Sequence, residues 1–265
     1  MTLIELLFLA IIQGITEFLP VSSSAHLILP SALIEGFSDQ GAMLEVAAHV
    51  GTLFAVILYF RADVLRLFFG LRDFAKREES ADRRLFEVIG LGTIPFLFAG
   101  TMVALTGLND HLRNPIVIAW ASILFGILLF VADRQPQTVK GDVSTFRAAM
   151  WIGLAQCLAL IPGTSRSGIT ITASRFLGYG RKDAARFSML LAIPAIGASG
   201  LYATYDLIRS GDLGNIGAAF LIAVLSFGAA LAAISLFLKA SERFSFTPFV
   251  IYRIVLGLII FLVVT

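Results

Sequence analysis

The sequence predicts an all-α integral membrane protein with six transmembrane helices and two re-entrant helical hairpins arranged as an inverted repeat. Three observations favour this fold. Of the 265 residues, 58% are hydrophobic and 14% are charged, a balance unlike that of a soluble domain. Six stretches approach the roughly 20 apolar residues that a helix needs to cross a bilayer. Two further apolar segments carry polar groups at their centres, and neither fits a simple span.

The predicted spans are separated by short connections, over which most of the basic residues are spread. We therefore expect no nucleic acid partner, because the positive charge is not gathered into a soluble module. The lone Cys157 excludes an internal disulfide, and we interpret it as a packing residue. The six spans cover residues 43–60, 85–107, 115–132, 184–207, 215–238 and 246–264.

The first polar-centred segment, residues 1–34, contains Glu17, Pro20 and His26 between two apolar ends. A single span would have to bury two ionisable side chains and cross a proline, and two full spans would need about 40 residues. A short helix, a loop at membrane depth and a second short helix fit better, provided that the loop is shielded by protein or lines a cavity.

The second polar-centred segment, residues 145–178, repeats this plan. Pro162 and Gly163 interrupt a helix, and Arg166 follows among hydroxyl-bearing residues before a helix can resume. A cation beside the exposed backbone N–H groups of a helix start is typical of an anion site.

The two segments resemble each other. Placing residues 13–24 on residues 156–167 aligns Gln13 with Gln156 and brings the prolines and the serine clusters within one residue. Broken helices paired in two halves of a chain indicate an internal repeat with its site near the membrane midplane. We expect the first repeat at 1–132 and the second at 145–265, with re-entrant hairpins at 1–34 and 145–178.

Charge placement predicts the topology independently. Sixteen of the twenty basic residues lie in the connections 61–84, 133–147, 175–186 and 239–243. The positive-inside rule places these connections in the cytoplasm. The two hairpins then enter from opposite faces, as an inverted repeat requires. A single span over residues 1–34 is the alternative, and it would break the repeat. In connection 61–84, we expect a helix extension at the anionic membrane surface, with a solvated charged face as the alternative for its second half.

Two arginines remain within apolar segments, where a charge at the bilayer centre costs about 2.5–3.5 kcal/mol. We expect Arg253 to extend from the start of the last span to the cytoplasmic interface. Arg166 lies on a loop among serines, and we interpret it as a ligand-binding residue. The alternative is a purely structural ion pair between Arg166 and Glu17.

Glu17 follows Gln13 by four residues, so both side chains share a helix face. Facing a cavity, they would suit Mg²⁺ or Ca²⁺ completed by phosphate oxygens. Glu17 as a general base and Glu17 in a packing network are the alternatives. Ser23 and His26 are spaced to meet as nucleophile and base, although capping would also explain them. We expect His49 to bond across a helix interface, with a supporting role at the site as the minority interpretation.

These residues resemble motifs of the bacterial undecaprenyl-pyrophosphate phosphatase family, which is linked to bacitracin resistance. The first motif is QGITEFLPVSSSAH at residues 13–26, and the second is PGTSRSGIT at residues 162–170. The resemblance covers the whole chain, including FSMLLAIPAI at 187–196 and Tyr252-Arg253. The family fold of six spans and two re-entrant hairpins agrees with the charge argument.

The resemblance implies hydrolysis of a polyprenyl diphosphate to the monophosphate with a divalent cation, which recycles the lipid carrier for cell-wall synthesis. The family's (Glu or Gln)-x-x-x-Glu motif falls on Gln13 and Glu17, and its serine and histidine fall on Ser23 and His26. This chain has Gln rather than Glu at the first position of the motif, which argues against a metal site built from two carboxylates. Ala25 stands where many members have Gly. The expected phosphate-binding residues are Ser22, Ser24, Gly163, Thr164, Ser165, Arg166, Ser167 and Thr170.

We predict that Arg166 holds the phosphates, Glu17 organises the cation, Ser23 attacks the terminal phosphorus and His26 handles the proton. Direct attack by water is the alternative for Ser23. A polyprenyl-phosphate transporter or flippase is the rival from another class, because inverted repeats with broken helices are typical of transporters. We expect a bacterial inner-membrane protein, surrounded by membrane lipids, whose site faces the periplasm. The sequence is compatible with a homo-oligomer and does not specify the oligomeric state.

Overall fold

The computed structural model describes residues 3–27, 42–108, 112–210 and 215–264, and the regular structure in these ranges is helical except for one isolated bridge between Val139 and Tyr179. Within these described ranges, five helices are long and apolar enough to cross a membrane, and a sixth crossing arises if the bent pair α3–α4 is one span. This confirms an all-α membrane protein. The elements are α1 (Leu3–Thr16), α3 (Ala42–Tyr59), α4 (Arg61–Lys76), α5 (Ala81–Thr106), α7 (Pro115–Asp133), α8 (Phe146–Gln156), η1 (Cys157–Leu160), α9 (Arg166–Phe176), α10 (Arg181–Ser210), α11 (Ile216–Arg243) and α12 (Thr247–Val264).

Each of the six predicted spans coincides with one helix, namely α3, α5, α7, α10, α11 and α12. Their boundaries follow local capping chemistry. Asn114 caps the backbone N–H of Ile116, and Pro115 occupies the first turn of α7, where its missing N–H costs nothing. Asn215 caps α11 in the same way through the N–H of Ala218.

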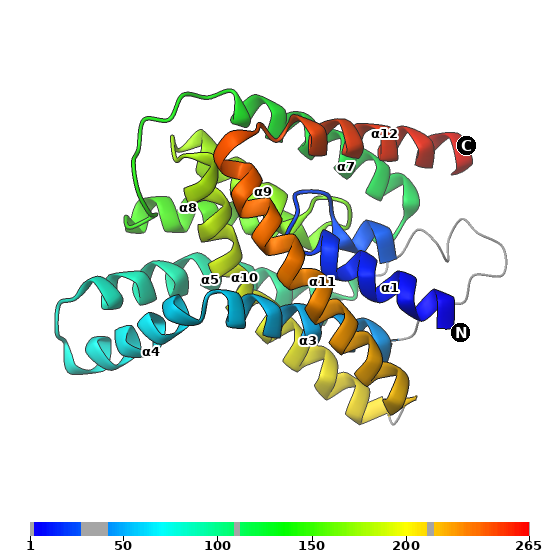
Figure 1. Ribbon diagram of the computed structural model, residues 1–265, viewed down its shortest axis with the longest axis horizontal. Helices are drawn as coiled ribbons and strands as arrows, with labels where there is room; N and C mark the ends of the chain where they lie inside the picture. Colours follow the sequence, from blue (N-terminus) through cyan, green and yellow to red (C-terminus); the bar gives the residue numbers. More distant parts are fainter. Residues whose placement is uncertain (1–2, 28–41, 109–111, 211–214, 265) are drawn as a thin grey trace.

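The predicted helix extension after residue 60 is wrong in one respect, because α4 is a separate helix that turns by 84° from α3. It ends at Lys76, the following residue Arg77 adopts the left-handed conformation, and Ser80 then caps α5. In Figure 1, α4 lies beside α5 at one end of the molecule. Several large apolar side chains of α4 are exposed, including Phe68 and Phe74. An apolar helix face beside arginines fits the expected location at a membrane surface.

The first polar-centred segment is interrupted as predicted. Helix α1 ends at Thr16, the chain turns through residues 17–22, and a short helical stretch follows at 23–27. The expected return of this hairpin at 28–34 lies outside the described residues, as does most of the following connection.

The second polar-centred segment is also interrupted, because α8 and η1 end before Ile161 and α9 begins at Arg166. Ser165 caps α9 by accepting a hydrogen bond from the N–H of Gly168 at 3.1 Å. Gly163 has φ +93, and a Cβ atom there would lie 2.5 Å from the carbonyl oxygen of Ile118 on α7. Glycine is therefore required at position 163 both by the positive φ and by the lack of room for a side chain.

Small residues let α1, which leads into the first loop, and α3 approach α11 closely. A Cβ atom on Gly14 of α1 would meet Ala229 of α11 at 2.5 Å, and one on Gly51 of α3 would collide with the backbone carbonyl of Ala223. Helix α11 thus packs against both α1 and α3 (Figure 1). This agrees with the helix packing expected in lipid, where small residues permit close contact.

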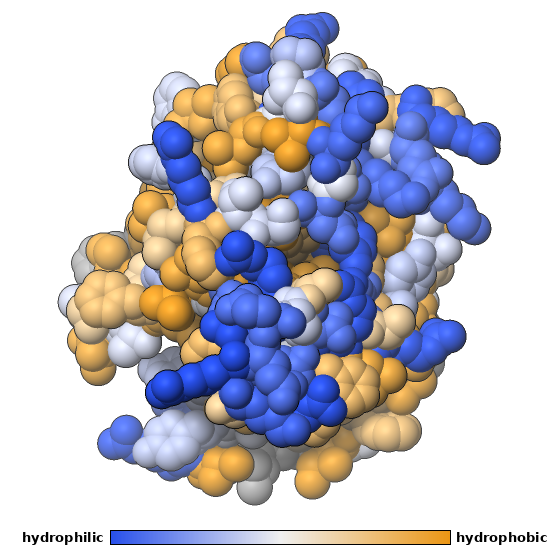
Figure 2. Space-filling view, turned by 90° about the vertical axis from the view of Figure 1, so that its left-hand side faces the viewer, coloured by the Kyte–Doolittle hydropathy of each residue, from blue (hydrophilic) through white to orange (hydrophobic). Residues whose placement is uncertain are grey.

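Charged residues gather at one end of the molecule. The turn between α4 and α5 and the connection between α7 and α8 both lie at this end in Figure 1. Figure 2 shows this face, where hydrophilic side chains surround a hollow. Within a cavity of about 740 Å³, Asp133 pairs with Arg181 at 2.6 Å, and Arg175 donates to backbone carbonyls. The grouping matches the connections that the charge pattern assigns to the cytoplasm.

Candidate active site

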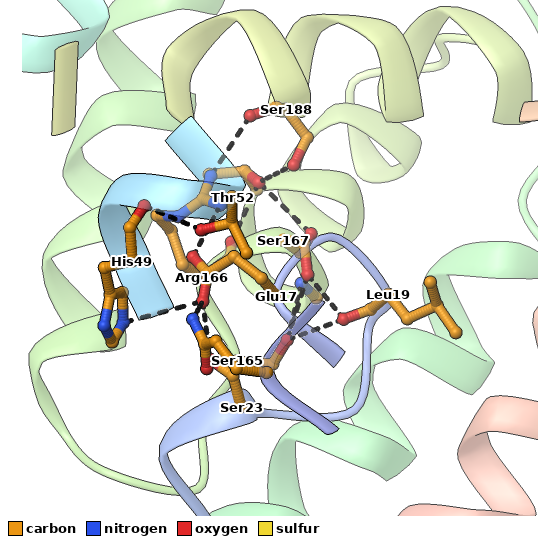
Figure 3. Close-up of polar contacts among 12 residues, drawn as sticks. Glu17, Leu19, Ser23, His49, Thr52, Ser165, Arg166, Ser167 and Ser188 are labelled. Atoms are coloured by element: carbon orange, nitrogen blue, oxygen red, sulfur yellow. Dashed lines mark hydrogen bonds and ion pairs between the residues drawn. The ribbon is translucent and has the colours of Figure 1, made fainter. Parts of the chain in front are cut away.

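Glu17 and Arg166 meet between the two interrupted segments. Arg166 Nη2 lies 3.3 Å from Glu17 Oε1, although 149 positions separate the residues in the chain (Figure 3). Their side chains are only 6% and 11% exposed, yet both line a cavity of about 160 Å³. The ion pair considered as a structural alternative therefore exists, and it also forms one wall of a cavity. The lining residues are Glu17, Ser22, Ser23, Ser24, His49, Phe96, Ala159, Ser165, Arg166, Ala195, Ile196 and Ser199.

Arg166 is held from two sides. It is the first residue of α9, so its side chain starts where the backbone N–H groups of that helix are free of intrahelical partners. Its Nη1 donates to the carbonyl oxygen of Ser188 on α10 at 3.3 Å, while Nη2 reaches Glu17. A fixed guanidinium beside a helix N-terminus is suited to phosphate oxygens.

Glu17 lies at the centre of the polar contacts in Figure 3. Its Oε2 accepts hydrogen bonds from Gln13 Nε2 at 2.8 Å and from the Ser23 hydroxyl at 2.7 Å. His49 Nε2 lies 3.7 Å from the same oxygen. The carboxylate is therefore surrounded by donors, and the hydroxyl of Ser23 directs its proton at it.

The expected contact between Ser23 and His26 is not formed. His26 Nδ1 bonds the carbonyl oxygen of Ser22 at 2.7 Å, and its Nε2 bonds the hydroxyl of Tyr252. Because a carbonyl oxygen only accepts, Nδ1 carries the proton and Nε2 accepts from Tyr252. The spacing of three residues places Ser23 and His26 on neighbouring parts of one helical turn, but their side chains serve different partners.

Each loop contains a serine in the left-handed region. Ser22 has φ 76 and Ser165 has φ 68. Ser22 corresponds to Ser165 when Gln13 is aligned with Gln156, so the same strained conformation recurs at matching positions. Such conformations cost on the order of 1–3 kcal/mol and cluster at functional sites. The match supports the predicted repeat, whose boundaries stay a prediction.

The expected phosphate-binding residues divide into two groups. Ser22, Ser24, Ser165 and Arg166 line the cavity.

The other four expected phosphate-binding residues do not line the cavity. They are Gly163, Thr164, Ser167 and Thr170. Ser167 donates to the carbonyl oxygen of Leu19 at 2.7 Å, and Thr170 bonds the hydroxyl of Ser188. A loop at membrane depth must satisfy its polar groups within the protein, which explains why these hydroxyls hold the loops together.

The residues expected to bind a cation fit only in part. No group of three or more His, Cys, Asp or Glu side chains that could hold a metal ion occurs among the described residues. Gln13 is fully buried and does not line the cavity, and its amide nitrogen faces Glu17. The reverse orientation would place two oxygen acceptors against each other. Glu17 is therefore suited to a cation completed by phosphate oxygens, whereas Gln13 is oriented as a donor to Glu17.

Arg253 does not extend to the interface as expected. Its side chain is fully buried, and Nη2 donates to the carbonyl oxygens of Gly163 and Thr164, both at 2.9 Å. The reason is that these carbonyls belong to an interrupted helix and need donors. From the sequence, Tyr252 was named only as part of the family resemblance and given no role, and His49 was given only a minority role at the site. A titratable residue in an apolar span was the available signal for His49.

The chain matches one protein family over most of its length. Residues 6–259 match the family described as "Bacitracin resistance protein BacA". The chain belongs to this family. It is 49% identical over 265 residues to the undecaprenyl-diphosphatase of Dinoroseobacter shibae and 47% identical over 265 residues to that of Jannaschia sp., with 99% of both chains covered in each case. It is 49% identical over 261 residues to the undecaprenyl-diphosphatase of Hahella chejuensis, with 97% of this chain and 96% of the relative covered.

For this BacA family member, the resemblance inferred from the two loop motifs is confirmed along nearly the whole chain. The cavity combines an arginine guanidinium, a carboxylate and an adjacent hydroxyl with an apolar wall formed by Phe96, Ala195 and Ile196. This arrangement can hold a phosphate next to a lipid chain and transfer a proton from a hydroxyl to a carboxylate.

Proposed function

We propose that the chain hydrolyses undecaprenyl diphosphate to undecaprenyl phosphate and phosphate. This activity recycles the lipid carrier for cell-wall synthesis and confers resistance to bacitracin. The observation that carries the proposal is the convergence of Glu17, Ser23 and Arg166 on one cavity with an apolar wall. The relatives are named undecaprenyl-diphosphatase, which supports the same substrate.

In the proposed reaction, Arg166 and the N–H groups at the start of α9 bind the terminal phosphate. The Ser23 oxygen attacks the terminal phosphorus, and its proton passes to Glu17 Oε2 at 2.7 Å. The bond from this phosphorus to the bridging oxygen breaks, and undecaprenyl phosphate leaves with the electron pair. Water then attacks the phosphoserine, and the bond from the Ser23 oxygen to phosphorus breaks. Glu17 returns its proton to the Ser23 oxygen, and phosphate leaves with the protons of the attacking water. Stabilisation of the transferring phosphoryl group by Arg166 is expected to be the largest contribution.

Direct attack by water, with Glu17 as the base, is the alternative to a phosphoserine. Glu17 serves as proton acceptor in both mechanisms. His26 bonds Ser22 and Tyr252, so its contribution is the placement of the first loop.

We further propose that Mg²⁺ or Ca²⁺ binds with Glu17 as its protein ligand and with substrate oxygens completing the site. When bound, the cation would neutralise charge on the phosphates. A hard cation that keeps water and substrate ligands suits a site with one carboxylate.

The proposed location is the bacterial inner membrane, with the cavity opening towards the periplasm. The described charged connections gather at one end of the molecule, which the positive-inside rule assigns to the cytoplasm. The loop that carries Glu17 and Ser23 belongs to the hairpin expected to enter from the other side.

The test is phosphate release from undecaprenyl diphosphate by the purified protein in detergent. Arg166→Ala and Glu17→Ala should each abolish release, whereas Arg209→Ala, at an exposed arginine near the end of α10, should leave it unchanged. Substrate binding without turnover by the unmodified protein would contradict the proposal and favour a polyprenyl-phosphate transporter.

A further inference from the structure

Two neighbouring residues of α12 hold the two loops of the site. The hydroxyl of Tyr252 contacts His26 Nε2 in the first interrupted segment. The Nη2 atom of Arg253 contacts the carbonyl oxygens of Gly163 and Thr164 in the second. Neither α12 residue lines the cavity. A single turn of one helix is thus bonded to both halves of the site.

The first connection continues from Tyr252 through His26 to the backbone. The rings of Tyr252 and His26 are stacked, with centroids 5.6 Å apart and planes inclined by 7°. The Nδ1–H of His26 then donates to the carbonyl oxygen of Ser22 at 2.7 Å. Ser22 is the strained residue of this loop, with φ 76, and Ser23 follows it directly.

The second connection reaches the equivalent place in the other loop. Arg253 is fully buried, and its Nη2 also lies 3.3 Å from the carbonyl oxygen of Ala121 on α7. Its described hydrogen-bond partners are all backbone carbonyls. These carbonyls immediately precede Ser165, the strained residue with φ 68, and Arg166 follows directly.

We propose that Tyr252 and Arg253 are positioning residues that hold Ser23 and Arg166 at the separation required for phosphoryl transfer. The inference rests on the proposed function. A strained backbone persists only where its surroundings fix it, and each strained serine immediately precedes a group of the site. Because both connections originate from one helical turn, the placement of Ser23 depends on the same element as the placement of Arg166.

The experiment uses Tyr252→Phe, which keeps the stacked ring but removes the hydroxyl, and Arg253→Lys, which keeps the charge but removes the branched guanidinium. Amide hydrogen exchange of the full-length protein in detergent should rise about tenfold or more in residues 21–27 for Tyr252→Phe alone and in residues 161–166 for Arg253→Lys alone. For each variant, kcat on undecaprenyl diphosphate should fall by about 10- to 100-fold, with KM within about twofold of its original value.

Ile251→Ala is the control, because Ile251 is the adjacent α12 residue and is 57% exposed. It should change neither exchange in the two loops nor kcat. Unchanged exchange in both loops, or equal increases in both loops for either variant, would overturn the proposal. A fall in kcat that merely follows a fall in melting temperature would overturn it as well. If the unmodified protein releases no phosphate, the proposed function fails, while the exchange pattern still decides whether Tyr252 and Arg253 position the loops.

Discussion

The hydroxyl of Ser23 donates a hydrogen bond of 2.7 Å to Glu17 Oε2, across the loop that follows α1. A serine bonded to a carboxylate is a nucleophile beside its base, provided that the substrate phosphorus reaches the serine oxygen. The same carboxylate contacts Arg166 through its other oxygen. The Glu17 carboxylate, which would accept the serine proton, and the Arg166 guanidinium, which would bind the phosphate, are therefore fixed relative to each other.

Ser23→Ala should lower phosphate release by at least about 100-fold, because it removes the proposed nucleophile, while the melting temperature stays nearly constant. Rapid acid quenching of the unmodified protein during turnover should trap phosphate on Ser23, detectable by mass spectrometry. Ser144→Ala is the control, since Ser144 is an exposed serine that does not line the cavity. Full activity of Ser23→Ala would instead support direct attack by water.

The buried ion pair predicts a non-additive effect on stability. Glu17→Gln or Arg166→Gln alone leaves one buried charge without its partner, which should destabilise the protein by about 3–5 kcal/mol. The double variant removes both charges and should be more stable than either single variant, although it remains inactive. Thermal unfolding in detergent and phosphate release provide the two measurements.

Arg113→Gln provides the matched control for this stability effect. Arg113 pairs with Glu45 at 3.4 Å, but its side chain is 46% exposed, so the loss should be about 0–1 kcal/mol. Additive losses in the Glu17 and Arg166 double variant would show that the two charges are not energetically coupled.

Sequence reasoning predicted the elements that composition and spacing determine. Hydrophobic length defined all six spans, and the Pro-Gly break defined the loop before Arg166. It failed for Arg253 and His26 because spacing along a helix does not specify which neighbouring helix a side chain faces. The carbonyls that Arg253 satisfies lie about 90 positions earlier in the chain. Likewise, Tyr252, one partner of His26, is 226 positions away, and local spacing could suggest only partners near His26 in the chain.

Gly163→Ala should abolish phosphate release, because the new Cβ would lie 2.5 Å from the Ile118 carbonyl oxygen and displace the loop that carries Arg166. Gly107→Ala is a matched control, since Gly107 also has a positive φ, +67, but its Cβ would meet open space. The control should cost only about 1 kcal/mol of backbone strain and leave activity intact. Phosphate release and the melting temperature distinguish the two cases. Equal loss of activity in both variants would mean that the backbone conformation alone, and not the contact with α7, accounts for the effect.

The orientation of Gln13 predicts how a second carboxylate would behave at this site. In the present structure, the Gln13 amide donates to Glu17 at 2.8 Å in a fully buried position. Gln13→Glu replaces this hydrogen bond with two facing carboxylates, which can coexist only with a bound proton or cation. We expect the variant to lose about 1–3 kcal/mol of stability in the presence of a chelator. Added Mg²⁺ or Ca²⁺ should restore its melting temperature, because a cation that binds only the folded state stabilises it.

The unmodified protein is the reference for this comparison. Its melting temperature should change little on chelation, since Glu17 is already surrounded by Gln13, Ser23 and Arg166, whereas its phosphate release should cease. Gln13→Met removes the amide without adding charge and should not acquire a cation-dependent melting temperature. A Gln13→Glu variant that is as stable with chelator as with Mg²⁺ would contradict the assignment of Glu17 as the ligand of the cation, because a carboxylate facing Glu17 would then require no cation between them.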